Sequence, residues 1–387
     1  SSGVVNLLNP AAFSAAPQKS FLFNFGLEGQ NYYNSQTVAG QSKSTAYNTF
    51  NFHDIAFQLP LARRLGLGFS LTPYSSVGYR VSADEQSDDV WGNIGRVQYL
   101  YAGEGDLTEV KLGIGWEVVK RVSIGVAAQY YWGDIERTYQ TVVSNNIVNG
   151  GSVNTVTGTD SYGISRIKMQ LGLQADLIQS ERQVLTLGAT YDMGGNLRPS
   201  VNQTVVNGDI YGTVVRGDTT RMALKLPVQL GVGLYYQNAK IAAGVDYIYQ
   251  NWENNESPKS VPGAVNVAYK NTNTVKLGFE YTPNRMDIRN YLKRWSYRVG
   301  FRYGTYYQTF EGKTLSQYAV TAGFGMPVRF LGRSSIDFGV EFGQRGNDSP
   351  LRIDNRQIGL VRQRYVKFSL GLTLFGEDSW FVRYKYD

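Results

Sequence analysis

Long runs of two-residue alternation constrain this chain more than any other feature. Between residues 110 and 116, apolar side chains at every second position alternate with Lys111, Gly113 and Gly115. Successive side chains of a strand point to opposite faces, so this run predicts a strand with one apolar face and one polar or glycine face. The pattern recurs at residues 122–129, 167–174, 219–236, 295–302, 336–343 and 366–372. The chain is therefore predicted to be all-β.

The length of the runs and the chemistry of their polar face favour a membrane barrel over a soluble sandwich. The runs reach roughly 10–15 residues, whereas soluble strands average about 5–6 and a tilted membrane strand needs about 9–11. Their polar face carries Lys, Arg, Asp and Glu beside many glycines, which is typical of a lumen lining. Tyr and Trp gather near the predicted strand ends, as in an interfacial belt; ordinary aromatic usage in a β-rich protein is the alternative.

Short and long connections alternate, which predicts an antiparallel barrel of about fourteen strands. Short connections are expected in the periplasm and long polar ones outside; the long ones include residues 34–45, 80–105 and 139–160. An even strand count places both chain ends in the periplasm. Because Ser1 is not an initiator Met, the chain is expected to be a mature form or a trimmed sequence.

The barrel is expected to span residues 19–375, with residues 376–387 as a periplasmic tail or a last short strand. Residues 1–18 lack alternation and contain Asn9, Pro10, Ala11 and Ala12. A lumen of about fourteen strands lies between the packed eight-stranded and the open sixteen-stranded barrels, so it needs a filler. The N-terminal segment is the predicted plug, and a frayed tail is the alternative.

Composition excludes several kinds of catalytic and metal site. With no Cys, thiol catalysis, disulfides and Cys-ligated metal centres are excluded. The one His, His53, shares strand phase with Ile55, Phe57 and Leu59, which predicts an outward side chain unable to serve a lumenal Ser-His-acid site. We therefore expect no catalytic residues, no metal site, no cofactor and no enzymatic activity.

Charge is spread singly along the chain. The net charge of +7 comes from 38 Lys and Arg against 31 Asp and Glu, without a basic block, so no nucleic-acid partner is expected. Lys225, Arg298, Arg302 and Glu341 are predicted lumen charges. Ion pairing across the lumen is their expected role, and a site for a carboxylate headgroup is the alternative. The basic excess could equally face lipopolysaccharide phosphates.

Short motifs resemble the FadL-like outer-membrane transport family in its divergent Bacteroidota form. They are residues 9–12, Phe21–Gly26 with sequence Phe-Leu-Phe-Asn-Phe-Gly, Leu71–Tyr79, and Trp380–Arg383. The resemblance implies an integral outer-membrane barrel plugged by its N-terminal segment. It also implies that a kink in the third strand opens the wall sideways and releases hydrophobic substrate into the bilayer.

Thr72, Pro73, Tyr74 and Ser75 are the predicted lateral gate, because a strand proline removes a ladder donor and favours a bulge. Other predicted strands also contain prolines, so proline alone does not identify a gate. The long loops are rich in Asn, Ser, Thr and Gly and lack the apolar capture surface that the family implies.

Two functions follow from these observations. The first is passage of small hydrophobic or amphipathic compounds across the outer membrane. The second is a non-conducting accessory barrel in a multi-protein outer-membrane assembly or export machine, and an adhesin is a third possibility. Trp380, Phe381 and Tyr384 of the aromatic tail are predicted to dock on the barrel rim or on a partner. Expected partners are outer-membrane lipid and lipopolysaccharide, a hydrophobic small molecule, and envelope proteins.

Overall fold

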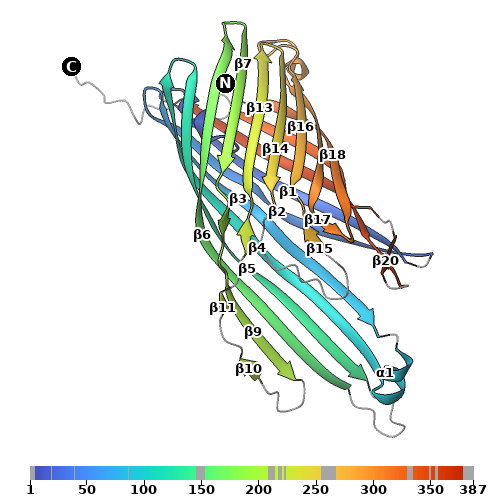
Figure 1. Cartoon of the computed structure of the whole chain (residues 1–387). Helices are drawn as coiled ribbons and strands as arrows, with labels where there is room; N and C mark the ends of the chain where they lie inside the picture. The colour runs from blue at the N-terminus through green and yellow to red at the C-terminus, as the bar shows by residue number, and fades with distance from the viewer. Residues whose placement is uncertain are drawn as a thin grey trace.

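The computed structural model is a closed, tilted barrel of long antiparallel strands (Figure 1). It describes residues 5–18, 20–38, 40–85, 87–144, 153–207, 214–216, 220–221, 224–253, 267–328, 334–347, 350–353 and 356–377. Fourteen strands form the wall, which confirms the predicted all-β class and strand count. Among the described residues, no helix is long and apolar enough to cross a membrane.

Neighbouring wall strands are neighbours in sequence, and antiparallel pairing of the first with the last, Ser20 opposite Glu377, closes the barrel. The wall strands are β1 (Ser20–Val38), β2 (Gln41–Ala62), β3 (Leu65–Asp84), β4 (Arg96–Val119), β5 (Val122–Ser144), β6 (Val153–Gln179), β7 (Gln183–Asp192), β13 (Val228–Asn238), β14 (Ile241–Asn251), β16 (Thr272–Tyr281), β17 (Ser296–Phe310), β18 (Lys313–Val328), β19 (Ser334–Arg345) and β22 (Val361–Glu377).

Shorter elements lie at the ends of this wall or inside it. The short strands are β8 (Gly195–Asn196), β9 (Ser200–Asn207), β10 (Val214–Arg216), β11 (Thr220–Arg221), β12 (Lys225–Leu226), β15 (Val267–Tyr269), β20 (Pro350–Ile353) and β21 (Arg356–Gly359). The helices are the 3₁₀ turns η1 (Pro10–Ala15) and η2 (Tyr291–Arg294) and the α-helix α1 (Asp88–Asn93).

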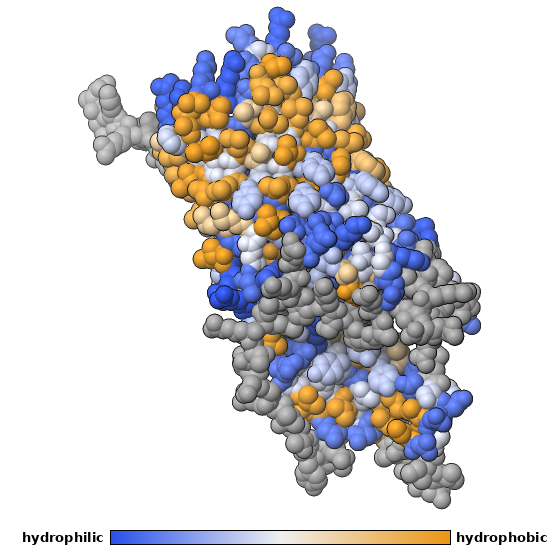
Figure 2. All heavy atoms as spheres, in the orientation of Figure 1, coloured by the Kyte–Doolittle hydropathy of each residue, from blue (hydrophilic) through white to orange (hydrophobic). Residues whose placement is uncertain are grey.

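The predicted alternation sets the two faces of the wall. Leu112, Ile114 and Trp116 of β4 are 43–50% exposed on the outside, whereas Lys111, which precedes Leu112, is buried on the inside. Figure 2 shows the resulting apolar belt across the visible face of the upper part of the barrel. Such a belt faces the hydrocarbon core of a bilayer, where only closed barrels and helices satisfy all backbone groups.

The strands continue well beyond the belt on the side of the long connections, which corrects three predicted loops. Within the described residues, 34–45 belong to the ends of β1 and β2 and the turn between them, and 80–105 to the ends of β3 and β4 with α1 between them. The described parts of residues 139–160 belong to β5 and β6. Beyond the belt the outer face becomes polar while the ladder continues. Apolar alternation therefore predicts the membrane part of each strand and misses its extension.

The alternating run at residues 219–236 was predicted to be one strand, and the structure divides it. Pro227 separates β12 from β13, and β12 pairs with β8 instead of the wall. Leu224 and Leu226, predicted to face lipid, instead pack against the buried cluster of Leu107, Tyr131, Ile164 and Leu197. A proline lacks the backbone donor that an uninterrupted ladder needs at that position.

Candidate functional site in the barrel lumen

The N-terminal segment lies inside the barrel against the inner faces of β2 to β6. Asn9 begins η1: its side-chain oxygen accepts from Ala11 N at 3.0 Å, and its side-chain nitrogen donates to the Leu173 carbonyl at 2.9 Å. The side chains of Ala11 and Phe13 are 0% and 2% exposed. One asparagine therefore both starts the turn and fastens it to the wall.

Glycines on the inner face of β3 to β6 make room for this segment. A Cβ on Gly66 would lie 1.9 Å from the Phe13 carbonyl oxygen, and a Cβ on Gly125 would lie 2.3 Å from Ala11 N. The same holds, with distances of 2.2–2.8 Å, for Gly68, Gly113, Gly115 and Gly172. No residue with a side chain fits at these positions while the segment stays in place, so the wall is shaped to hold it.

Wall side chains also hold the backbone of the segment. Lys111 Nζ donates to the Leu7 carbonyl at 2.9 Å, and Gln170 donates to the Leu8 carbonyl at 3.2 Å. The donors come from two strands, β4 and β6. Because both part-buried carbonyls accept hydrogen bonds from wall side chains, the backbone of the segment is held to the wall at Leu7 and Leu8.

Ion pairs line the opposite part of the lumen. Arg298 of β17 bridges Glu280 of β16 at 2.8 Å and Asp337 of β19 at 2.5 Å. Arg302 lies four residues further along β17, on the same face, and pairs with Glu341 at 2.8 Å. The wall register therefore pairs Arg302 with Glu341, both predicted lumen charges, and places Arg298, a third, beside two other carboxylates. Lys225, the fourth, lies on β12 and not on a wall strand.

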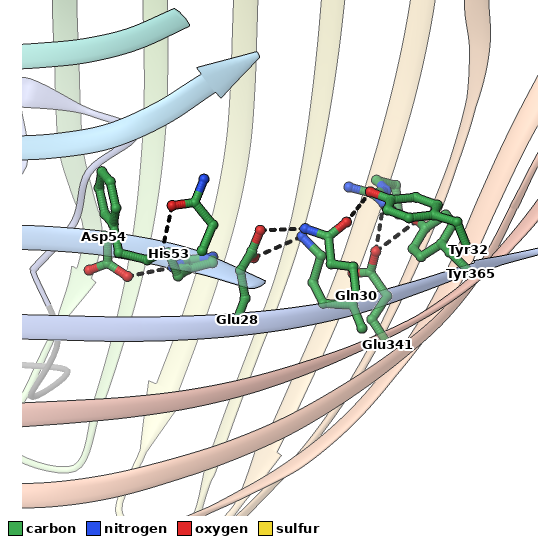
Figure 3. A network of polar contacts seen from close by, with 11 residues as sticks. Glu28, Gln30, Tyr32, His53, Asp54, Glu341 and Tyr365 are labelled. Atoms are coloured by element: carbon green, nitrogen blue, oxygen red, sulfur yellow. Dashed lines mark hydrogen bonds and ion pairs between the residues drawn. The ribbon is translucent and has the colours of Figure 1, made fainter. Parts of the chain in front are cut away.

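Figure 3 shows how this network continues to β1 and β22. Tyr365 donates to Glu341 at 2.8 Å, and Lys367 pairs with Glu28 at 3.0 Å. Glu28 also accepts a hydrogen bond from Gln30. Charge on this side of the lumen is therefore largely matched within the wall.

The prediction that His53 faces outward is wrong. The pairing of β1 with β2 shifts at Gly26/Leu27, and this bulge turns both His53 and Asp54 toward the lumen, where they contact each other (Figure 3). Both line a cavity of 700 Å³. Strand phase cannot be carried across a bulge, because one extra residue reverses the face of everything beyond it.

A second cavity of 1410 Å³ extends from the N-terminal segment to β3. Buried polar side chains line part of it, among them Glu109, Gln129 and Asp192. Gln129 donates to the carboxylates of both Glu109 and Asp192, at 3.5 and 3.3 Å, while its own side-chain oxygen has no protein partner. Among the described residues, no group of three or more His, Asp or Glu side chains is arranged to hold a metal ion.

The wall is interrupted between β2 and β3. These strands pair only from Ala62 opposite Leu65 to Ile55 opposite Leu71, and the β3–β4 register then shifts between Pro73 and Ser75. Beyond Leu71, no described strand pairs with this side of β3.

The four predicted gate residues lie at this interruption. Thr72 and Tyr74 line the larger cavity, and the Tyr74 ring meets the Tyr131 ring edge-on with centroids 4.8 Å apart. The predicted docking residues Trp380, Phe381 and Tyr384 lie outside the described residues.

Comparison with known proteins decides the family. All residues 1–387 match the family model described as BamG. The chain belongs to the BamG family. No curated protein matches it.

Solved structures share the barrel of this BamG family member. A FadL homologue from Pseudomonas aeruginosa is 13% identical, with 95% of this chain and 93% of that chain covered and a TM-score of 0.65. The toluene transporter TodX from P. putida is 16% identical, with 95% and 92% covered and a TM-score of 0.59. The toluene transporter TbuX from Ralstonia pickettii is 15% identical, with 95% and 92% covered and a TM-score of 0.55.

These likenesses show a FadL-like fold and, with the apolar belt, an integral protein of the bacterial outer membrane. The predicted resemblance is confirmed at that level, and the Bacteroidota assignment stays a prediction.

Proposed function

We propose that this chain is a non-conducting accessory barrel, a subunit of a multi-protein assembly in the outer membrane. The observation that carries the proposal is the lumen, which holds a fastened N-terminal segment and is lined by paired charges. Membership in the BamG family supports the same conclusion.

The charged lining disfavours flux of hydrophobic compounds. A hydrocarbon passing Arg298 and its two carboxylates would displace water from charged groups without providing a hydrogen bond. The larger cavity presents Glu109, Lys111 and Asp192 from the opposite wall. Sites for apolar compounds place few polar groups in their lining, whereas here charged groups lie on both sides of the lumen.

The N-terminal segment is proposed to be a plug that stays in place. Its carbonyls are held by donors from the wall, and its bulk occupies positions that only glycines leave free. Removing it would cost the buried contacts of Phe13, which for a phenylalanine are worth about 3–5 kcal/mol. The predicted segmentation into plug, barrel and tail is part of this proposal.

Proteoliposomes test the proposal directly. The full chain and a variant lacking residues 1–16 are each reconstituted, and ion conductance and equilibration of the fluorescent apolar probe N-phenylnaphthylamine are measured. The proposal expects the full chain to match empty liposomes in both assays and the deletion to conduct ions. Probe equilibration through the full chain, faster than through empty liposomes, would refute a non-conducting role.

The interrupted wall favours a second candidate, passage of a small hydrophobic or amphipathic compound with lateral release at β3. The larger cavity reaches Thr72 and Tyr74 beside the unpaired part of β3. Structures of the same fold include toluene transporters and monoaromatic hydrocarbon channels. Under this candidate, Tyr74→Trp slows probe equilibration by narrowing the exit, whereas Tyr318→Trp on the exposed outer face of β18 leaves it unchanged.

A further inference from the structure

Beyond the membrane belt, β3 has a free edge. Its residues Thr72–Asp84 pair with β4 on one side only, while the facing part of β2, Gln41–Asp54, pairs with β1 only. In the described part of the chain, no strand fills the space between them. Every second residue of such an edge turns its backbone N–H and C=O toward the empty side, where another strand can bind.

The sequence of this edge lacks the usual protection against pairing. Residues 75–83 read Ser-Ser-Val-Gly-Tyr-Arg-Val-Ser-Ala, with Arg80 as the one charge and no proline. Natural edge strands are blunted by lysines, prolines, bulges or short length. Here the bulge at Pro73/Ser75 lies at the beginning of the edge and leaves the rest regular.

The sheet that carries this edge has the reverse polarity of the membrane wall. Register places Val81 of β3, Tyr101 of β4 and Tyr139 of β5 in one row on the inner face, continuous with the inward residues of the belt. Tyr79, Val81, Tyr139 and Val156 on this face are 39–53% exposed. Most neighbouring outer-face positions are polar, among them Arg80, Ser82, Glu104, Glu136 and Thr157, while Leu100 and Ala102 opposite Ser82 and Arg80 are apolar.

Two of the inner-face rings lie flat on glycines of the next strand. A Cβ on Gly103 would lie 2.3 Å from the Tyr79 ring, and a Cβ on Gly158 would lie 2.0 Å from the Tyr139 ring. The rings are therefore positioned before any partner arrives. A preorganised aromatic surface loses little conformational entropy when it is covered.

We propose that the free edge of β3 accepts an extended segment of a partner protein as an added strand. The segment would place apolar side chains beside Tyr79 and Val81 on the inner face and polar ones beside Arg80 and Ser82 on the outer face. This inference rests on the proposed accessory function, since it names how a partner binds. The exposed apolar face alone would suit any amphiphile, but the row of backbone donors and acceptors suits a polypeptide.

Hydrogen exchange with a defined probe tests the proposal. The full chain in lipid nanodiscs is mixed with a synthetic peptide as long as the edge, in which Val and Tyr alternate with Thr and Lys. A second peptide has the same composition in blocks. We expect the alternating peptide, and not the block peptide, to slow amide exchange in residues 75–83. Equal protection by both peptides, or by lipopolysaccharide micelles alone, would show amphiphile binding and overturn the proposal.

Two neighbouring substitutions provide matched variants. Val81→Asp puts a carboxylate on the inner face, and we expect peptide binding to weaken roughly tenfold, because the carboxylate would be buried among apolar groups. Ser82→Asp puts the same group on the outer face and should leave binding within about threefold, since it stays in water. Equal effects of the two substitutions on peptide binding would contradict an added strand whose apolar side chains lie on the inner face.

The outcomes also separate this inference from the accessory function. A barrel that conducts neither ions nor apolar probe but ignores the alternating peptide would retain its accessory role and lose the β3 site. A barrel that binds the alternating peptide and also passes the apolar probe would retain the β3 site and lose the non-conducting accessory role.

Discussion

The inner-face glycines of β3 to β6 that contact the N-terminal segment are called the glycine seat here. Replacing one of them by alanine should displace the segment without destabilising the barrel. In Gly125→Ala, the new Cβ would lie 2.3 Å from Ala11 N and from the Pro10 carbonyl carbon, both of them backbone atoms that cannot rotate away. Overpacking of this kind costs about 1–3 kcal/mol. At tenfold per 1.4 kcal/mol, the equilibrium between the seated and the displaced segment should shift roughly 5- to 150-fold toward displacement.

A cysteine in the segment reports the displacement, because the natural chain contains none. Ser14 is half-buried and hydrogen-bonded to the Ala11 carbonyl and to Ser123 Oγ, each at 2.8 Å, so Ser14→Cys should react slowly with a maleimide. We expect Gly125→Ala to accelerate labelling by the factor above. The control is Gly278→Ala, an inward glycine with no atom within 4 Å of its Cβ position. An unchanged labelling rate in Gly125→Ala, or equal acceleration in the control, would refute the claim that these glycines hold the N-terminal segment in place.

Three further predictions concern the lumen network and the loop between β16 and β17. Arg298→Met leaves Asp337 without its ion pair and Glu280 with Arg285 alone, and should destabilise the barrel by about 1–3 kcal/mol. The loss is measured as the urea midpoint of the heat-sensitive gel shift, and an unchanged midpoint would show that the pairing is energetically neutral. Tyr365→Phe removes the hydroxyl that donates to Glu341 and should cost about 1 kcal/mol in the same assay, with no loss counting against the network. In the loop, hydrogen bonds from the Asn290 and Arg289 N–H groups hold the pKa of the Asp287 carboxyl below its usual range. These hydrogen bonds therefore stabilise the loop fully at pH values above the usual pKa of an aspartate, and the stabilisation is lost as the pH falls through the lowered pKa. Limited pepsin cleavage of the loop should therefore increase toward low pH in the natural chain and be high throughout in Asp287→Ala; equal cleavage would contradict this.

Alternation predicted the part of the fold that lipid enforces. In the belt, one face must be apolar at every second position, so Leu112, Ile114 and Trp116 identify their strand and its facing without further information. Beyond the belt both faces contact water or protein, and the backbone ladder alone maintains the strand. A sequence such as Ser75–Ala83 then has the composition of a loop and the geometry of a strand.

Irregularities in the ladder account for the errors in the lumen. The bulge at His53 changes the face that this residue occupies, and the break at Pro227 takes the preceding Leu224 and Leu226 out of the wall. Proline gave a visible signal at the second site, whereas nothing in the residues around His53 marks a bulge. The glycine seat did leave a signal in the sequence: inward glycines concentrate on consecutive strands, at Gly66, Gly113 and Gly125 among others.

The most direct test of the accessory role is mass spectrometry of the protein extracted gently, at native expression level, from its own outer membrane, with proteins and lipids read from the same sample. The account predicts a stoichiometric set of envelope proteins and no apolar small molecule retained in the lumen. A barrel recovered alone, carrying a fatty acid or similar apolar ligand, would contradict it and establish the transport candidate in its place.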